Sequence, residues 1–172
     1  MAGRSNVGKS TLINALCRRK VARTSAAPGK TRLANVYRTV MTGGGPGQWT
    51  LYLVDLPGYG YARGGADAAT ELRAVAEAYF RVSGSAALLL VDSRHPGLES
   101  DIQASRWLSA MNVTYRVVAT KVDKLSRRER AQNLGALEMS LGMPPVPVSA
   151  ERGEGLDELW KTIASLVRTG HA

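Results

Sequence analysis

Apolar residues along the chain recur at two different spacings, and these predict strands and helices in alternation. Continuous or alternating apolar runs predict strands at 33–41, 49–54, 86–92, 114–119 and 145–148. Apolar residues at every third or fourth position predict one helix that begins near Lys9 and others over 72–80, 104–111, 134–141 and 156–167. This alternation indicates an α/β fold, a mostly parallel sheet with helices on both faces.

The first two predicted strands flank the turn sequence G-G-G-P-G at 43–47, so we expect one antiparallel hairpin feeding the sheet. We find no repeat and no linker, which favours a single domain over 1–172. No apolar run approaches the roughly 18 residues of a membrane span, and no signal segment leads the chain. The one cysteine, Cys17, excludes an internal disulfide. We therefore expect a cytoplasmic monomer.

The positive charge is concentrated in the first third of the chain. Residues 1–54 contain nine basic residues and no acid, whereas the other 14 basic residues are balanced by 14 acidic ones, so the net charge of +9 lies before Asp55. Such asymmetry points to a polyanionic partner, and Arg18, Arg19, Lys20 and Arg23 form the densest cluster. A solvated basic face is the alternative explanation.

Gly3 to Ser10 reads G-R-S-N-V-G-K-S, which matches the phosphate-loop pattern G-x-x-x-x-G-K-[ST]. In this pattern the glycines let backbone N–H groups face a phosphate chain, Lys9 reaches the β and γ phosphates, and Ser10 offers a hydroxyl to Mg²⁺. The helix that follows adds its N-terminus to the anion site. The loop alone does not distinguish adenine from guanine, or hydrolysis from transfer.

Three later segments favour guanine. D-L-P-G at 55–58 ends a predicted strand, where a carboxylate can hold a metal through water and Gly58 can offer its N–H to a γ-phosphate. In T-K-V-D at 120–123, Asp123 can accept from N1–H and N2–H of guanine, and the Lys121 stem can lie against the base. S-A at 149–150 can present a backbone N–H to the guanine O6.

These segments resemble the EngB-type ribosome-assembly GTP-binding proteins, within the translation-factor class of P-loop GTPases. The resemblance rests on G-R-S-N-V-G-K-S-T-L-I-N-A-L, A-R-T-S-A-A-P-G-K-T-R, V-D-L-P-G-Y-G-Y-A and T-K-V-D-K-L. Thr120 stands where most GTPases have Asn, and T-K-x-D-K together with Y-G-Y distinguishes this family. The chain departs from the family pattern at the glycine-rich hairpin 43–47 and in the missing residues before Gly3. The resemblance implies binding of GTP or GDP with Mg²⁺, association with ribosomal RNA and the large ribosomal subunit or its precursor, and a role in cell division and septation.

The resemblance also implies the site residues. The nucleotide contacts come from Gly3, Arg4, Ser5, Asn6, Val7, Gly8, Lys9 and Ser10; from a first switch at Gly29, Lys30, Thr31, Arg32 and Leu33; from a second switch at Asp55, Leu56, Pro57 and Gly58; from the base reader Thr120, Lys121, Val122 and Asp123; and from Val148, Ser149 and Ala150. The Mg²⁺ ligands are Ser10, Thr31 and Asp55, and the groups acting on the transferred phosphate are Lys9, Thr31 and Gly58.

Slow intrinsic GTP hydrolysis is expected, because Tyr59 stands where small signalling GTPases have the glutamine that orients water. Activation by a ribosomal surface, or by K⁺ held partly by Asn6, is one hypothesis; a loop-shaping hydrogen bond is the other explanation for Asn6. Two alternatives to a GTPase are a non-hydrolysing guanine-nucleotide module and a P-loop kinase or ATPase.

Only Met1 and Ala2 precede the phosphate loop, which normally follows a full strand inside the sheet. We therefore expect the native protein to carry roughly 20 to 30 further residues that end in a short apolar strand. In this chain we expect a vacant or collapsed slot between the strands at 49–54 and 86–91, and a poorly anchored Gly3.

Overall fold

The computed structural model describes residues 1–22, 34–42, 48–56, 58, 74, 76–81 and 85–169. The predicted turn at 43–47 and most of the loop and helix between 57 and 84 lie outside these residues. The elements are β1 (Ala2–Gly3), α1 (Lys9–Cys17), β2 (Asn35–Thr42), β3 (Gln48–Asp55), β4 (Ala87–Asp92), α3 (Glu99–Ala110), β5 (Tyr115–Thr120), a 3₁₀ turn (Val122–Lys124), α4 (Arg127–Leu141), β6 (Val146–Pro147) and α5 (Leu156–Thr169).

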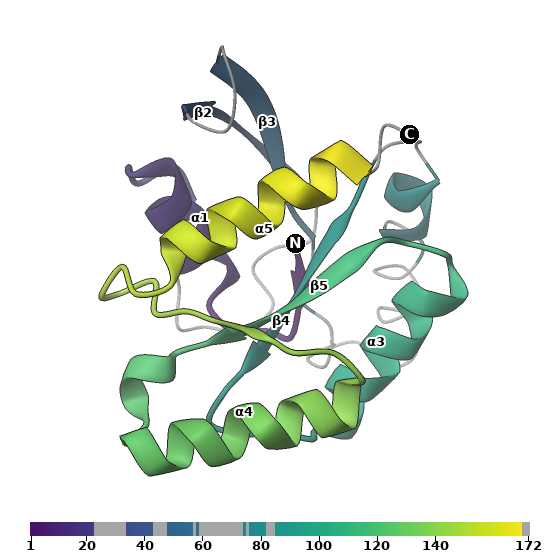
Figure 1. The fold of residues 1–172 in the computed structure, drawn as a ribbon. Helices are drawn as coiled ribbons and strands as arrows, with labels where there is room; N and C mark the ends of the chain where they lie inside the picture. The colour runs from purple at the N-terminus through teal and green to yellow at the C-terminus, as the bar shows by residue number, and fades with distance from the viewer. Residues whose placement is uncertain are drawn as a thin grey trace.

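The sheet confirms the predicted α/β fold. Parallel strands lie in the order β1-β4-β5-β6, and β2 and β3 form the predicted antiparallel hairpin, which extends beyond α5 in Figure 1. β6 covers only Val146–Pro147 of the predicted 145–148 run. Among the described helices, none combines the length and apolar character that a bilayer span requires.

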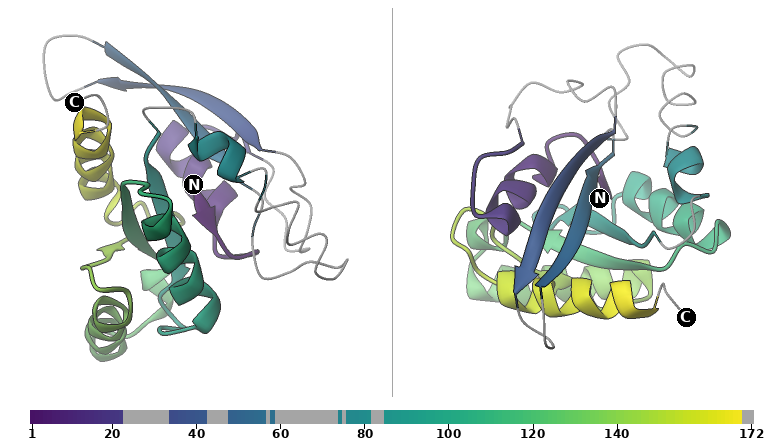
Figure 2. Two further views of the ribbon diagram at one scale, coloured as in Figure 1. Left: turned by 90° about the vertical axis from the view of Figure 1, so that its right-hand side faces the viewer. Right: turned by 90° about the horizontal axis from the view of Figure 1, so that it is seen from above.

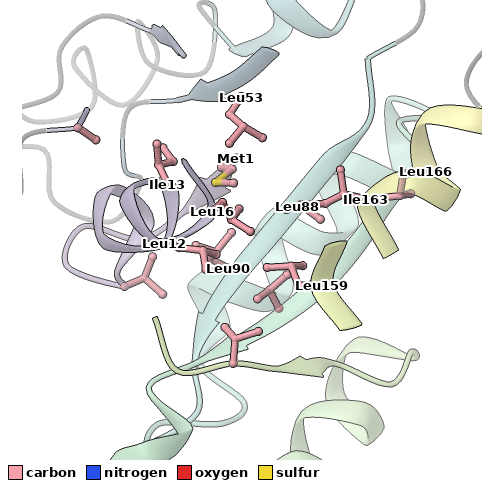
Figure 3. Close-up of a cluster of buried hydrophobic side chains, with 14 residues drawn as sticks. Met1, Leu12, Ile13, Leu16, Leu53, Leu88, Leu90, Leu159, Ile163 and Leu166 are labelled. Carbon is pink, nitrogen blue, oxygen red and sulfur yellow. The ribbon is translucent and has the colours of Figure 1, made fainter. Parts of the chain in front are cut away.

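Alternate residues of β4 supply two separate cores, because successive strand side chains point to opposite faces. Leu88 and Leu90 pack with α1 and α5, and Leu89 and Val91 pack with α3 and α4. Figure 3 shows the first core, in which Leu12, Ile13 and Leu16 of α1 and Leu159, Ile163 and Leu166 of α5 gather around β4. The parallel strand is therefore apolar along its whole length, as its sequence predicts.

The short β1 is firmly held, so the expectation of a poorly anchored Gly3 is wrong. Ala2 and Gly3 pair with Leu89 and Leu90 of β4, and all three residues from Met1 to Gly3 are buried. A Cβ added to Gly3 would lie 2.9 Å from Leu90 O, so only glycine permits this close approach. Backbone pairing over two residues is enough to anchor the loop entrance.

Met1 occupies the end of this short strand. Its amino group donates to Val54 O, and Leu56 N–H donates to Met1 O across 3.1 Å. Burial lowers the pKa of the amino group from 8.0 to about 5, against the attraction of Asp55. Met1 thus lies between β3 and β4, with its backbone bonded to the β3 side, as predicted for the strand that enters the phosphate loop.

Candidate functional site

The phosphate-loop sequence forms a tight curl between β1 and α1. Gly8 at φ 106° and Asn6 at φ 63° take left-handed conformations, which glycine and asparagine tolerate best. Val7 is 2% exposed and fixes the middle of the loop in the core. Gly8 immediately precedes Lys9, the first residue of α1. The loop therefore places a helix N-terminus and its N–H groups at one end of the concave backbone, where an anion binds favourably.

Lys9 reaches back across this curl. Its Nζ donates to Gly3 O at 2.9 Å and to Arg4 O at 3.1 Å, and the residue is 8% exposed. Burial lowers the pKa of Lys9, and the nearby Asp55 carboxylate acts in the opposite direction. A partly desolvated ammonium that donates to two neutral carbonyls is suited to pairing with phosphate oxygens.

Gly58 lies directly on the phosphate loop. A Cβ added at this position would lie 2.9 Å from Ser5 N and 3.0 Å from Lys9 Nζ, so a larger residue would push the two loops apart. The structure therefore brings the D-x-x-G glycine beside the predicted phosphate position. Pro57, between Leu56 and Gly58, lies outside the described residues.

Asp55 and Ser10 form the described part of the predicted metal site. The Asp55 carboxylate is 2% exposed at the end of β3, and Ser10 Oγ donates to its Oδ2 across 3.4 Å. Within the described residues, its buried Oδ1 accepts no hydrogen bond. Burial raises the pKa of Asp55, while Lys9 and the amino terminus lower it. Mg²⁺ prefers oxygen ligands, so this orphaned carboxylate oxygen and the serine hydroxyl fit such an ion. The third predicted ligand, Thr31, lies outside the described residues with the rest of Gly29 to Leu33.

The T-K-V-D segment is bonded to the phosphate loop. Thr120 Oγ1 lies 2.7 Å from Val7 O and 3.1 Å from Val91 O, as donor to both. Lys121, at φ 61°, donates from Nζ to Asn6 O at 2.7 Å. A threonine hydroxyl thus links the loop to β4 and β5 at the position where most GTPases have Asn.

The Asp123 carboxylate lies at the far end of this segment, with a side chain 3% exposed. Its buried Oδ2 accepts no hydrogen bond of good geometry among the described residues, although Lys124 Nζ is 3.2 Å away. Burial opposes ionisation, but hydrogen bonding by Ser149 and the nearby Lys124 ammonium together lower the pKa of Asp123. The carboxylate is therefore charged at neutral pH and retains an acceptor for donors such as guanine N1–H and N2–H.

The predicted S-A loop, residues 149–150, follows a strand end that is hydrogen-bonded to the base reader at 120–123. Val148 N–H donates to Ala119 O at 2.8 Å, and Val122 N–H donates to Val148 O at 3.3 Å, so the two loops leave the sheet side by side. Ser149 is fully buried, and its N–H donates to Glu154 O at 2.9 Å. The phosphate loop, Asp123 and this loop thus lie where strands of the parallel sheet end, the usual ligand edge of an open α/β sheet, and Asp55 at the end of β3 lies beside Ser10 of α1.

Asp92 is the residue that the sequence analysis missed. It ends β4 and is 4% exposed; Arg94 donates to both of its oxygens at 2.9 and 2.7 Å, and Lys121 Nζ donates to Oδ2 at 2.8 Å. Burial opposes the charge, but the bonds from Arg94 and Lys121 prevail and hold the pKa of Asp92 below its ordinary value. The available signal was V-D-S-R at a strand end, where an acidic residue faces the ligand edge.

Replacing Asp92 by Asn should weaken guanine-nucleotide binding about 10-fold, since a neutral amide holds the Lys121 ammonium less firmly than a carboxylate does. Equilibrium titration with a fluorescent GDP derivative measures this. Because the folded pKa lies below the unfolded value of about 3.9, the ion pair stabilises the fold at neutral pH and its contribution falls as the pH drops below about 4.

The matched control is Arg94→Gln, which leaves the Asp92 to Lys121 contact in place and should change the affinity less. Equal losses in both variants would show that Asp92 acts through general stability and not through Lys121.

Comparison with known proteins agrees with this arrangement. A family model described as "50S ribosome-binding GTPase" matches residues 1–121. The probable GTP-binding protein EngB of Syntrophomonas wolfei is 41% identical over 172 residues, covering 97% of this chain and 85% of its own. The probable EngB of Solibacter usitatus is 42% identical over 169 residues, covering 96% and 84%.

Three solved structures share the fold. A single-residue variant of Aquifex aeolicus Era bound to GDP·AlF₄⁻ has a TM-score of 0.80 at 24% identity, covering 96% of this chain. Era with MgGDPNP and nucleotides 1506–1542 of 16S ribosomal RNA has a TM-score of 0.79 at 26% identity. This chain spans about half of those two Era chains, 55% and 54%. A probable GTP-binding protein engB has a TM-score of 0.69 at 23% identity, covering 98% of this chain and 97% of its own.

Proposed function

The chain belongs to the EngB family of GTP-binding proteins, and from that membership we propose that residues 1–172 form one GTP-binding domain that hydrolyses GTP slowly. The observation that carries the proposal is the position of Lys9, Asp55 and Asp123 on segments that are bonded to the phosphate loop or belong to it. Among the described residues, each of the two carboxylates has one buried oxygen without a well-formed hydrogen bond.

In this proposal the loop from Gly3 to Ser10 encloses the β and γ phosphates. Lys9 exchanges its carbonyl partners for phosphate oxygens, and Gly58, already in contact with the loop, presents its N–H to the γ-phosphate. Ser10, Asp55 and Thr31 would hold Mg²⁺, which when bound neutralises charge that develops on the transferred phosphate. These residues position the phosphates and neutralise their developing negative charge. Phosphoryl transfer to water requires little else from a protein.

The same proposal assigns the guanine ring to the space beside Asp123. The carboxylate accepts from N1–H and N2–H, and the Lys121 stem lies against one face of the ring. Because Ser149 already uses its N–H within its own loop, the contact to guanine O6 falls to Ala150. Thr120 does not touch the base in this assignment; its hydroxyl keeps the reader attached to Val7.

Competition and turnover assays test this function. Unlabelled GTP should displace a labelled guanine nucleotide whereas ATP should not, and displacement by ATP would favour a kinase or ATPase instead. Phosphate release should be slow alone and faster with ribosomes, because Tyr59 offers no carboxamide to orient water. Affinity without any phosphate release would support the non-hydrolysing alternative. Assays in potassium and in sodium buffers decide whether K⁺, held partly by Asn6, contributes.

We further propose that the domain acts in the cytoplasm as a monomer that binds the large ribosomal subunit or its precursor during assembly, and that cell division and septation depend on it. The large-subunit partner is supported by the matching family model, described as a 50S ribosome-binding GTPase, and contact with ribosomal RNA in general by the Era neighbour, which was solved with a piece of 16S ribosomal RNA. Three members of the basic cluster, Arg18, Arg19 and Lys20, have exposed side chains just past α1. The fourth member, Arg23, lies outside the described residues.

Reversing the charge of Arg18, Arg19 and Lys20 to Glu should lower binding to the large subunit by about 10-fold or more, and should flatten its dependence on salt. Each basic residue that neutralises a phosphate releases counterions, so affinity falls steeply with salt when such contacts exist. Co-sedimentation over a salt series measures both effects. The control is Arg127→Glu with Arg128→Glu on the exposed face of α4, and unchanged binding after the first reversal would refute this surface.

A further inference from the structure

The phosphate loop is attached to α3 by an ion pair that the site described above does not use. Arg4 Nε donates to Asp101 Oδ1 across 3.1 Å, although the two residues lie 97 positions apart in the chain. Asp101 is 1% exposed and belongs to the first turn of α3, where the helix N-terminus also favours a negative charge. A charge-assisted bond from a guanidinium to a buried carboxylate is strong and fixed in direction. The second residue of the loop therefore has a defined position relative to α3.

The main chain of Arg4 is part of the phosphate-binding curl. Its carbonyl oxygen accepts from Lys9 Nζ at 3.1 Å and from the Val7 N–H at 3.3 Å. The side chain of Arg4 thus bonds to α3, while its carbonyl bonds to the ammonium that we assign to the phosphates. A displacement of Arg4 would move both acceptor and ammonium, so the curl depends on where Asp101 holds this residue.

The rest of α3 gives Asp101 a rigid support. Leu108 of α3 is buried in the core that α3 and α4 form with β4 and β5. Trp107 Nε1 donates to Glu77 Oε1 at 3.3 Å, and the Trp107 ring meets the Phe80 ring edge-on, with 6.0 Å between their centroids. In Figure 2, α3 and residues 76–81 lie on the same side of the molecule. Asp101 therefore extends from a helix that is fixed in the core and also bonded to the segment after D-L-P-G.

On the basis of the proposed function of the phosphate loop, we propose that Asp101 is a positioning residue of the nucleotide site, which acts through Arg4. The carboxylate balances the guanidinium charge at α3, so the side chain of Arg4 serves the protein and only its main chain serves the nucleotide. Groups that bind a ligand keep their geometry only when a second layer of residues holds them. Without the carboxylate, the loop leaves its binding curvature more often and bound nucleotide dissociates faster.

A double-mutant cycle tests this role. The variants are Arg4→Gln, Asp101→Asn and the two combined. The matched control is Glu99→Gln, because Glu99 is an exposed carboxylate in the same first turn of α3. Hydrogen exchange at the Val7 amide, whose acceptor is Arg4 O, is measured first on nucleotide-free protein. Dissociation of a fluorescent GDP derivative and the affinities for GDP and guanosine are then measured on the same preparations.

Each single variant is expected to speed both exchange of the Val7 amide and release of GDP about 10-fold, because each loses one charge-assisted bond. Affinity for guanosine should change by less than about two-fold, since guanosine has no phosphate for the loop to hold. The combined variant should resemble the single variants, because two contacting residues lose their shared interaction only once. Glu99→Gln should behave like the unaltered chain.

Additive losses in the combined variant, or equal losses of GDP and guanosine affinity, would overturn the proposal, because the pair would then contribute general stability alone. Tighter GDP binding by Asp101→Asn would also overturn it, since the released Arg4 would then reach the phosphates. Arg4 is partly exposed, so Arg4→Gln keeps the test available if loss of the buried carboxylate impairs folding. If the unaltered chain bound no GDP, the proposed function would fail, whereas exchange at Val7 would still decide whether Asp101 orders the loop.

Discussion

Replacing Asp123 by Asn should exchange a preference for guanine for a preference for xanthine. The carboxylate accepts from N1–H and N2–H of guanine, whereas the amide offers an N–H to the carbonyl that xanthine carries in place of the N2 amino group. Two hydrogen bonds to a charged acceptor contribute about 1.5–3 kcal/mol each, so affinity for GTP should fall by at least about 100-fold while affinity for XTP rises. Parallel titrations with GDP and XDP derivatives measure the exchange.

Asp157→Asn is the matched control, because Asp157 is an exposed carboxylate on α5. It should leave both affinities unchanged. If the Asp123 variant kept its selectivity for GTP with an unchanged melting temperature, the base reader would have to be assigned to other residues.

Replacing Lys9 by Ala should abolish tight binding of guanosine di- and triphosphates. Lys9 is the buried cation at the centre of the phosphate loop, and charge-assisted bonds to phosphate oxygens in a desolvated site are among the stronger polar contacts. Loss of such bonds to the β and γ oxygens should lower GTP affinity by at least about 100-fold, and guanosine without phosphates should be affected far less.

Calorimetric titration with GTP, GDP and guanosine separates these cases. Lys161→Ala removes a lysine that is 76% exposed on α5 and should bind like the unaltered protein. Normal GTP affinity in a folded Lys9 variant would mean that the loop does not hold the phosphates. The unchanged secondary structure of that variant is checked by circular dichroism.

The sequence predicted the fold well where spacing alone determines the element. The apolar run at 86–92 and the periodic segment at 156–167 became β4 and α5 with nearly the predicted bounds. The positions of the site loops were also predictable, because loops that follow parallel strands gather at one edge of the sheet, where ligands bind in this class of fold. Their roles toward GTP and Mg²⁺ remain predictions, and those of Gly29 to Leu33 fall outside the described residues.

What the sequence did not predict depends on register between distant strands. Asp92 holds Lys121 because β4 and β5 pair Asp92 with Thr120, and no local pattern specifies that alignment. The role of Thr120 was hidden for the same reason, since its acceptors Val7 and Val91 belong to other elements. The misjudged Gly3 shows a further limit: no sequence pattern indicates that a two-residue ladder with Leu89 and Leu90 is enough to anchor the loop.

The pairing of Ala2 with Leu89 has a consequence for co-translational folding of the protein. The phosphate loop is synthesised early, yet the strand that orders its entrance is made more than 80 residues later. At about 5–20 residues per second, the nascent loop waits on the order of 5–20 s for its partner. During that interval the basic segment before Asp55 lacks the folded framework that β4 completes. We expect nascent chains arrested before β4 to remain protease-sensitive at the loop, and chains arrested after β5 to be protected.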